Sequence, residues 1–308
     1  MINLHVEPRV VKSWEQFLKE NHKFSVALDG YVRGKPRFDS SGPRINYNHH
    51  EDVDRLCTRS TCGQVYIGIK QGLLDIFRQD GEPYAEVYVN DADQDTCASI
   101  WLLQNNERIM RQKSEPLITR LVSVTDFLDT TAGAYPISPD TSVRMELAWI
   151  FQPYTSERMH GRIQHMQEAE MRNVIESVCN RISQYTLGRG KKIKLETDYE
   201  ILGGGRNWEL IKETGFDARS MLFSMGINAF VSVRENGNDT YTYSIGKISP
   251  YIDFPILDLY SALSEAEGFK DENDCWGGSD IIGGSPRKSG SRLKPKELER
   301  IINEFLEK

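Results

Sequence analysis

The stretch that decides the fold is Glu86–Leu103, EVYVNDADQDTCASIWLL, in which a short apolar strand leads into Asp91, Asp93 and Asp95 and then into a helix. Alternate side chains of an extended segment share one face, so the three carboxylates are expected to point the same way. Like charges that close destabilise a fold unless a cation neutralises them. The pattern predicts a metal site at the carboxyl end of a strand. The alternative is a polar turn in which an aspartate caps the helix, although one aspartate would suffice for that.

Composition excludes several classes of protein. The formal charge of −7 over 308 residues argues against non-specific binding of extended duplex DNA. A local basic pocket for a small phosphorylated ligand is compatible with this charge. The five cysteines contain no CxxC pair, which argues against a disulfide framework and a cysteine-type zinc site. No segment has the apolar length of a signal peptide or a membrane span. We therefore expect a cytoplasmic protein without a membrane partner.

Strands and helices are predicted to alternate in the first half of the chain. The predicted elements are a short helix over 11–22, a strand Phe24–Leu28, a helix Ser60–Phe77 that begins at Ser60 or Thr61, a strand Ala85–Val89 and a helix Thr96–Leu103. Residues 31–47 are rich in Gly, Pro and Ser and are predicted to form a loop. The alternation predicts an α/β fold with a mostly parallel sheet and helices on both faces. Ligands of such sheets gather at the carboxyl ends of the strands.

The second half is predicted to contain a connector and a smaller α/β unit. Leu117–Leu128 is apolar and reads as a strand that ends near Asp126 and Asp129, which makes it a further candidate for carrying ligands. The polar stretch 156–185 has apolar residues about one turn apart and is predicted to be one long helix. Beyond Lys191 the predictions are strands, a hairpin turn at Asn236-Gly237, and a final helix with Pro295 near its start.

Two adjacent histidines precede a group of acidic residues. In an extended chain His49 and His50 point to opposite sides, so one is expected to ligate a metal while the other reaches toward substrate or packs behind the ligand. Imidazole combined with several carboxylates suits Mn²⁺, Mg²⁺, Fe or Zn, and the large share of oxygen ligands favours manganese or magnesium. Because the carboxylates are too numerous for one ion, we predict two ions that activate water for in-line attack on phosphorus. The alternative is a solvated polar loop.

A glycine-serine motif near the end of the chain predicts an anion-binding loop. Glycines let backbone N–H groups approach an anion, serine hydroxyls add donors, and basic side chains balance phosphate charge. The predicted substrate-binding residues are Gly278, Ser279, Gly283, Gly284, Ser285, Arg287 and Arg292. A flexible surface loop is the alternative.

Together these motifs resemble the DHH phosphoesterase superfamily, which includes RecJ-like exonucleases, oligoribonucleases, phosphatases of 3′-phosphoadenosine 5′-phosphate and inorganic pyrophosphatases. The resemblance rests on Asp29-Gly30, NHHED at 48–52, DADQD at 91–95, Asp126 and the late Gly-rich motif. It implies a metal-binding catalytic domain over residues 1–153, a linker helix over 154–190, and a substrate-binding domain over 191–308.

The resemblance also implies roles for individual residues. The implied metal ligands are Asp29, His49, Asp93, Asp95 and Asp126, with Asp91 as a substitute for a missing histidine. His50 and Arg287 would steady the phosphate while a hydroxide bridging two Mn²⁺ ions attacks phosphorus.

This chain departs from the family in several places. The aspartate motif follows the histidine pair instead of preceding it, and Val89 stands where the family has a histidine. Asn48 replaces the aspartate of the Asp-His-His signature, and the late motif reads GGSP where the family has Gly-Gly-Gly-His.

The expected function is hydrolysis of a phosphate ester in a small nucleotide or a short single-stranded oligonucleotide. The alternative is a DHH-like protein that has lost catalysis and instead senses a nucleotide or binds a partner. A homodimer is compatible with the sequence.

Overall fold

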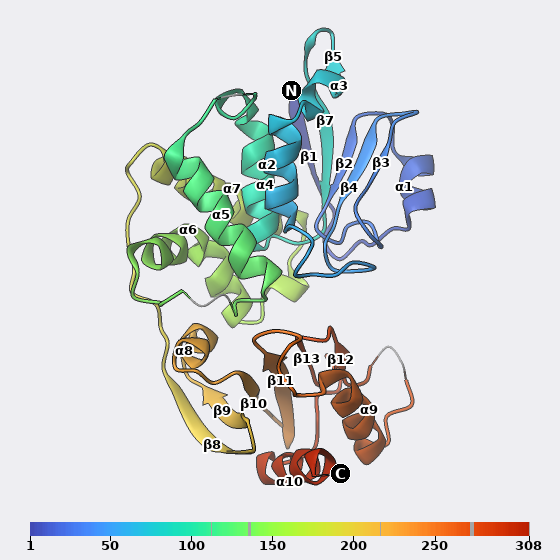
Figure 1. Cartoon of the computed structure of the whole chain (residues 1–308). Coiled ribbons are helices and arrows are strands. Elements are labelled where there is room, and N and C mark those ends of the chain that lie inside the picture. Colours follow the sequence, from blue (N-terminus) through green and yellow to red (C-terminus); the bar gives the residue numbers. More distant parts are fainter. Residues whose placement is uncertain (112, 135–136, 216, 272–273, 308) are drawn as a thin grey trace. The chain divides into compact units, whose positions relative to one another are not determined.

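The computed structural model describes residues 1–111, 113–134, 137–215, 217–271 and 274–307 (Figure 1). Backbone contacts divide the chain into two compact units. Unit 1 consists of Met1–Thr130 and Met145–Ile193, and unit 2 consists of Thr131–Arg144 and Lys194–Lys308. Residues 154–190, expected as a linker, therefore lie within unit 1. Over the described residues, no helix combines the length and apolar character needed to cross a bilayer.

Unit 1 is built on a five-stranded sheet in the order β1-β7-β2-β4-β3. Its strands are β1 (Ile2–Val6), β2 (Ser25–Leu28), β3 (Arg37–Asp39), β4 (Arg44–Tyr47) and β7 (Ala85–Val89). The strands β1, β7, β2 and β4 are parallel to one another. The edge strand β3 is antiparallel to β4. Every residue of β2 is buried, as expected for a strand inside a parallel sheet. The predicted α/β class and the predicted strand Ala85–Val89 are confirmed.

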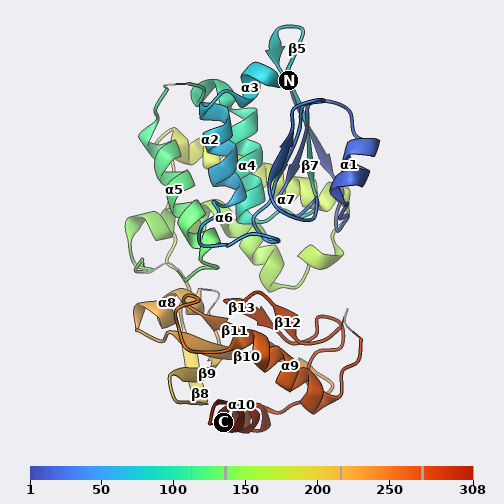
Figure 2. The same cartoon turned by 45° about the vertical axis from the view of Figure 1, so that its right-hand side comes forward.

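Helices cover both faces of this sheet. They are α1 (Trp14–Glu20), α2 (Thr61–Lys70), α3 (Leu73–Ile76), α4 (Gln94–Gln104), α5 (Pro116–Thr130), α6 (Ser142–Met159) and α7 (Glu168–Thr186). Figures 1 and 2 show α1 on one side of the sheet and the pair α2 and α4 on the other. On the α1 side, Phe17 packs in one apolar cluster with Ala27 and Tyr88 of the strands. A small hairpin, β5 (Arg78–Gln79) and β6 (Glu82–Pro83), precedes β7.

Two predictions for unit 1 are wrong, each for a local reason. Residues 31–47 contain β3 and β4, because this polar sequence pairs at the sheet edge. The helix predicted over Ser60–Phe77 does begin after Ser60, whose side chain accepts from Gly63 N, but it breaks between α2 and α3. The break occurs at Gly72, whose φ of 100° lies in the left-handed region.

Two further corrections concern helices. Leu117–Leu128 belongs to helix α5 and is not a strand. The single helix predicted over 156–185 is instead the end of α6 and most of α7, separated by a 3₁₀ turn at Ile163–His165. Gly161, with a φ of 67°, lies in the break.

Unit 2 has a six-stranded sheet in the order β12-β13-β11-β10-β9-β8. The strands are β8 (Tyr199–Gly205), β9 (Trp208–Glu213), β10 (Ala229–Gly237), β11 (Thr240–Lys247), β12 (Gly277–Gly278) and β13 (Ile282–Gly284), and the helices are α8 (Ala218–Ser224), α9 (Ile256–Glu267) and α10 (Pro295–Leu306). Only the pairing of β9 with β10 is parallel among these strands.

The predicted hairpin of unit 2 is present, but its turn is displaced. Gly237 pairs with Thr240, so the two turn residues are Asn238 and Asp239. Both have positive φ, 52° and 54°, which a two-residue turn of this kind requires. The helix predicted near Pro295 is confirmed, with this proline in its first turn.

Candidate metal centre

Acidic and imidazole side chains from four segments meet where parallel strands of unit 1 end. Asp29 follows β2, and His49 and His50 follow β4. Asp95 follows β7 and lies in the first turn of α4, while Asp129 lies in the last turn of α5. Asp29 has a φ of 44°, a left-handed conformation that aspartate tolerates better than most residues. This turn places its carboxylate beside the histidines.

His49 is the centre of the arrangement. Its side chain is fully buried, and Nε2 lies 2.8 Å from Asp129 Oδ2, 3.5 Å from Asp29 Oδ1 and 3.7 Å from Asp95 Oδ2. Yet neither ring nitrogen, nor Asp129 Oδ2, makes a well-aligned hydrogen bond within the described part of the chain. Buried polar atoms are nearly always hydrogen-bonded, so a group that binds nitrogen and oxygen together would fit this geometry. A metal ion is such a group.

Two groups of described side chains have the spacing of a metal site. One consists of Asp29, His49 and His50, and the other of His49, Asp95 and Asp129. Asp29, His49 and Asp95 are buried, Asp129 is half-buried and His50 is exposed, and together these residues could hold a metal ion. The two groups overlap at His49, so they form one continuous centre.

Helix N-termini hold the carboxylates in place. Asp95 Oδ2 accepts from Thr61 N at 2.6 Å, and Oδ1 accepts from Cys62 N at 2.8 Å, both in the first turn of α2. Asp93 is the N-cap of α4 and accepts from Thr96 N at 2.7 Å. These N–H groups carry the positive end of the helix dipole and favour negative charge. The expectation that residues 91–95 form one extended segment is wrong, because α4 begins at Gln94.

The carboxylates repel one another strongly. Burial, then Asp29 and Asp91, raise the pKa of Asp93 well above its ordinary value. Burial and Asp29 also raise the pKa of Asp91. For Asp95, burial together with Asp129 and Asp29 raises the pKa to about 7. A cluster with this charge favours either protons or a cation at neutral pH.

The two imidazoles act in the opposite direction. Burial would raise the pKa of Asp29, but His49 and His50 outweigh it and hold the pKa well below its usual range. Burial would likewise lower the pKa of His49, but the carboxylates of Asp129 and Asp29 outweigh it and raise the pKa to about 10. In the metal-free centre, the positive charge of a protonated His49 therefore neutralises part of the carboxylate charge that a metal ion would otherwise neutralise.

Asp126, predicted as a ligand, lies outside both groups. Its Oδ1 accepts from Ser60 N at 2.7 Å and its Oδ2 from Arg59 at 2.9 Å, so it braces the start of α2. Asp129, three residues later on the same face of α5, reaches His49 instead. The sequence motifs predict Asp126, and not Asp129, as the ligand. Recognising this segment as a helix would have shown both aspartates on one face.

The departures at Asn48 and Val89 have structural explanations. Asn48 is fully buried, and its Nδ2 donates to Val32 O at 3.2 Å and to Gly34 O at 3.0 Å. Its Oδ1 accepts from His50 N at 3.1 Å. An ionised aspartate has no donor for the two carbonyls, so this position requires an amide. Val89 is a buried core residue of β7 and supplies no ligand.

The glycines of the predicted anion-binding loop are needed for strand pairing in unit 2. A Cβ on Gly284 would lie 2.1 Å from Tyr243 O, and one on Gly283 would lie 2.0 Å from Tyr260 Oη. A Cβ on Gly278 would lie 2.4 Å from Gly283 Cα. Packing therefore accounts for glycine at these three positions.

The serine hydroxyls of that loop are used in hydrogen bonds within the protein, whereas its arginine side chains are exposed to solvent. Ser279 Oγ accepts from Ile282 N at 3.1 Å, and Ser285 Oγ accepts from Tyr243 N at 3.0 Å. Arg287 and Arg292 are exposed. The loop thus offers exposed cationic side chains, and its role in binding substrate stays a prediction.

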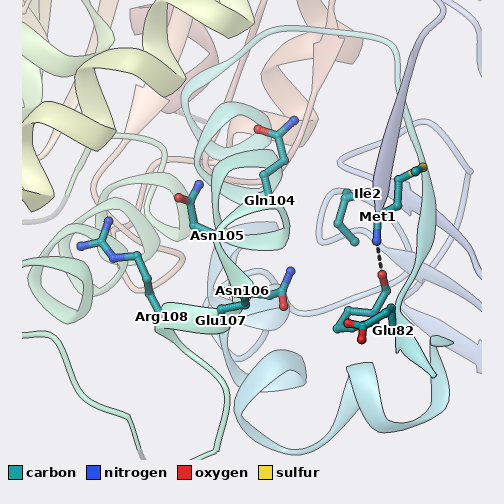
Figure 3. A pocket seen from close by; sticks show the side chains of 9 residues that line it. Met1, Ile2, Glu82, Gln104, Asn105, Asn106, Glu107 and Arg108 are labelled. Carbon is teal, nitrogen blue, oxygen red and sulfur yellow. Dashed lines mark hydrogen bonds between the residues drawn. The ribbon is translucent and has the colours of Figure 1, made fainter. Parts of the chain in front are cut away.

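A separate cavity of about 410 Å³ lies at the other end of α4 (Figure 3). Its lining consists of Met1, Ile2, Glu82, Pro83 and Gln104–Arg108. Asp93 and Asp95 lie at the amino end of α4, whereas this cavity adjoins its carboxyl end. The cavity therefore does not belong to the metal centre.

The sequence was also compared with known proteins. No protein-family model matches the chain, and no curated protein matches it significantly.

Proposed function

We propose that this chain is a metal-dependent phosphoesterase with a DHH-like catalytic unit. The observation that carries the proposal is the buried Nε2 of His49, which makes no well-aligned hydrogen bond within the described residues and faces the carboxylates of Asp29, Asp95 and Asp129. A nitrogen ligand among several carboxylates is typical of Mn²⁺ sites and compatible with Mg²⁺. The meeting of these residues at parallel strand ends supports the DHH-like arrangement.

The chain's own residues would divide the work as follows. Asp29, His49, Asp95 and Asp129 would hold a divalent cation. Asp91 and Asp93, whose pKa values are raised by burial and by Asp29, lie outside these groups and would be the ligands of a second ion. Bound cations supply Lewis-acid activation of water and neutralise phosphate charge.

His50 is suited to binding the substrate phosphate. Its side chain is about one-third exposed at 35%, and Nε2 lies 2.7 Å from Asp29 Oδ1, which orients the ring. When a bound cation occupies Asp29 Oδ1, the Nε2–H of His50 would be free to donate to a phosphate oxygen. The substrate class that fits is a small nucleotide or a short single-stranded oligonucleotide, because the net charge of −7 disfavours a long polyanion.

The test is a metal-dependent hydrolysis assay. Purified protein stripped with a chelator should gain hydrolysis of nucleotide phosphates or short oligonucleotides when Mn²⁺ is added. His49→Gln should lose both Mn²⁺ binding and activity. Asp80→Asn is the matched control, because Asp80 is exposed in the β5–β6 turn and its φ of 52° suits asparagine. Activity that needs no metal, or that survives in His49→Gln, would refute the proposal.

A second candidate function is nucleotide binding without catalysis. It is favoured by Val89, a core residue where the family has a histidine, because the centre then has one ligand fewer. Metal analysis separates the two functions. Less than one ion per chain, with nucleotide binding retained, would favour the non-catalytic protein.

A further inference from the structure

Arg55 lies against the metal centre and has no role in the residue set described so far. It belongs to the segment between β4 and α2. Its Nη1 lies 3.3 Å from His50 Nδ1, and its Nη2 donates to Asp129 O at 2.9 Å. The same Nη2 lies 3.5 Å from Asp129 Oδ2. One guanidinium thus touches both overlapping ligand groups.

The contact with His50 defines which hydrogens are available. Arginine has only donors, so Nη1 must donate and His50 Nδ1 must accept. The proton of a neutral His50 therefore lies on Nε2, where it points to Asp29 Oδ1 at 2.7 Å. Arg55 and Asp29 hold the ring between them from opposite sides, with His50 as a hydrogen-bond donor.

The guanidinium of Arg55 is incompletely used. It has five N–H donors, and the hydrogen bonds found for it within the described residues use two of them. Its Nε is buried and has no hydrogen-bond partner there. A buried guanidinium N–H without an acceptor costs free energy, so the geometry suits an additional anionic acceptor.

The neighbouring Arg59 provides a contrast within the same segment. Its Nη1 pairs with Asp126 at 2.9 Å, away from both ligand groups, and its side chain is 56% exposed. Arg55 has a side-chain exposure of only 19%. Of these two arginines, Arg55 is therefore the one whose charge acts on the centre.

We propose that Arg55 is the phosphate-recognition arginine of this centre, a specificity-determining residue that donates to an oxygen of a tetrahedral oxyanion bound at the metal ions. This proposal rests on the proposed function, since it assumes a centre loaded with metal. A guanidinium matches phosphate geometry with two parallel N–H groups, which a lysine cannot do. The ligand class is a terminal phosphate group, as in a nucleoside monophosphate.

The experiment measures phosphate binding to the metal-loaded protein and does not depend on turnover. Calorimetric titration gives the Mn²⁺ stoichiometry and affinity first, and then the affinity of the Mn²⁺-saturated protein for inorganic phosphate. The variants are Arg55→Met, which removes the donors, and Arg55→Lys, which keeps the charge. Arg59→Met is the matched control, and thermal unfolding verifies that each variant folds.

The expected result is that Arg55→Met binds Mn²⁺ with wild-type stoichiometry and binds phosphate about 10-fold or more weakly, the loss expected for a charge-assisted hydrogen bond. Arg55→Lys should recover part of the affinity, and Arg59→Met should bind phosphate like the wild type.

Three outcomes would overturn the assignment of Arg55. Phosphate affinity of Arg55→Met within about twofold of wild type, an equal loss in Arg59→Met, or loss of Mn²⁺ itself in Arg55→Met would each do so. The proposed function would stand in the first two cases, because the wild type would still bind Mn²⁺. Failure of the wild type to bind Mn²⁺ would instead refute the function and this inference together.

Discussion

The candidate metal centre of unit 1 and the glycine-rich loop of unit 2 both have sequence motifs that predict ligand binding, but their polar groups differ in hydrogen bonding. In unit 1, the buried ring nitrogens of His49 and the buried Oδ2 of the half-buried Asp129 make no well-aligned hydrogen bond within the described residues. In unit 2, Ser279 and Ser285 use their hydroxyls on neighbouring backbone N–H groups. A sequence motif shows which polar side chains are present. Buried polar atoms without aligned hydrogen bonds show which of those side chains have capacity left to bind a ligand.

The largest expected effect separates two aspartates of one helix. Asp129→Asn removes a carboxylate from the centre and should weaken Mn²⁺ binding about 100-fold, because ligand substitutions commonly cost at least the 10- to 100-fold reported for outer-shell groups. Asp126→Asn should leave Mn²⁺ affinity near wild type and instead destabilise the fold by about 1–3 kcal/mol, since Asp126 braces α2. Calorimetry and urea unfolding measure the two quantities. The reverse pattern would restore Asp126 as the ligand.

Gly284→Ala should affect unit 2 and leave the metal centre intact. Its Cβ would lie 2.1 Å from Tyr243 O, so β13 must shift away from β11. We expect a loss of about 2–3 kcal/mol in the free energy of unfolding, with Mn²⁺ affinity unchanged. Gly277→Ala is the control, because the space around it is open. Equal stability of the two variants would mean that packing does not explain glycine at position 284.

The pH dependence of the metal-free protein should reveal the charge of the centre. The pKa of His49 is raised to about 10, so its proton stabilises the fold fully below the unfolded-state pKa of about 6.5, and this stability is lost as pH rises toward 10. The free energy of unfolding in chelator should therefore fall between pH 7 and 9, by up to about 1.4 kcal/mol per pH unit.

His49→Gln and Mn²⁺ provide the controls for that slope. His49→Gln has no titrating imidazole, so its unfolding free energy should be flatter over the same interval. Saturating Mn²⁺ should also flatten the wild-type dependence, because a metal-bound imidazole stays deprotonated. Parallel slopes for the wild type and His49→Gln in chelator would contradict this account of the centre.

The smallest effect is expected at the exposed loop arginine. Arg287→Ala should change the free energy of unfolding by less than about 0.5 kcal/mol and leave Mn²⁺ affinity unchanged, because Arg287 is an exposed residue of unit 2. If this arginine binds substrate as predicted, nucleoside monophosphate affinity should fall several-fold. Unchanged nucleotide affinity would contradict the predicted role of Arg287 in binding substrate.

Several features of the fold could be predicted from local sequence patterns. The apolar run of β7 and the helix that follows it are readable because burial selects the residue types directly. Ser60 and Pro295 marked the starts of their helices because capping chemistry is local. Leu117–Leu128 was misread as a strand because an apolar run has the same composition in a buried helix and in a strand.

The sequence by itself determined the chemistry that this chain can offer: acidic residues after one strand, a histidine pair after another, an α/β alternation and a negative net charge. Only the tertiary structure decided which of these groups meet. Asp129, not Asp126, faces His49, and Arg55 contacts the centre while Arg59 does not. The physical reason is that a carboxylate or guanidinium acts over a few ångströms, and those distances are set by how α5, α2 and the strand ends pack together.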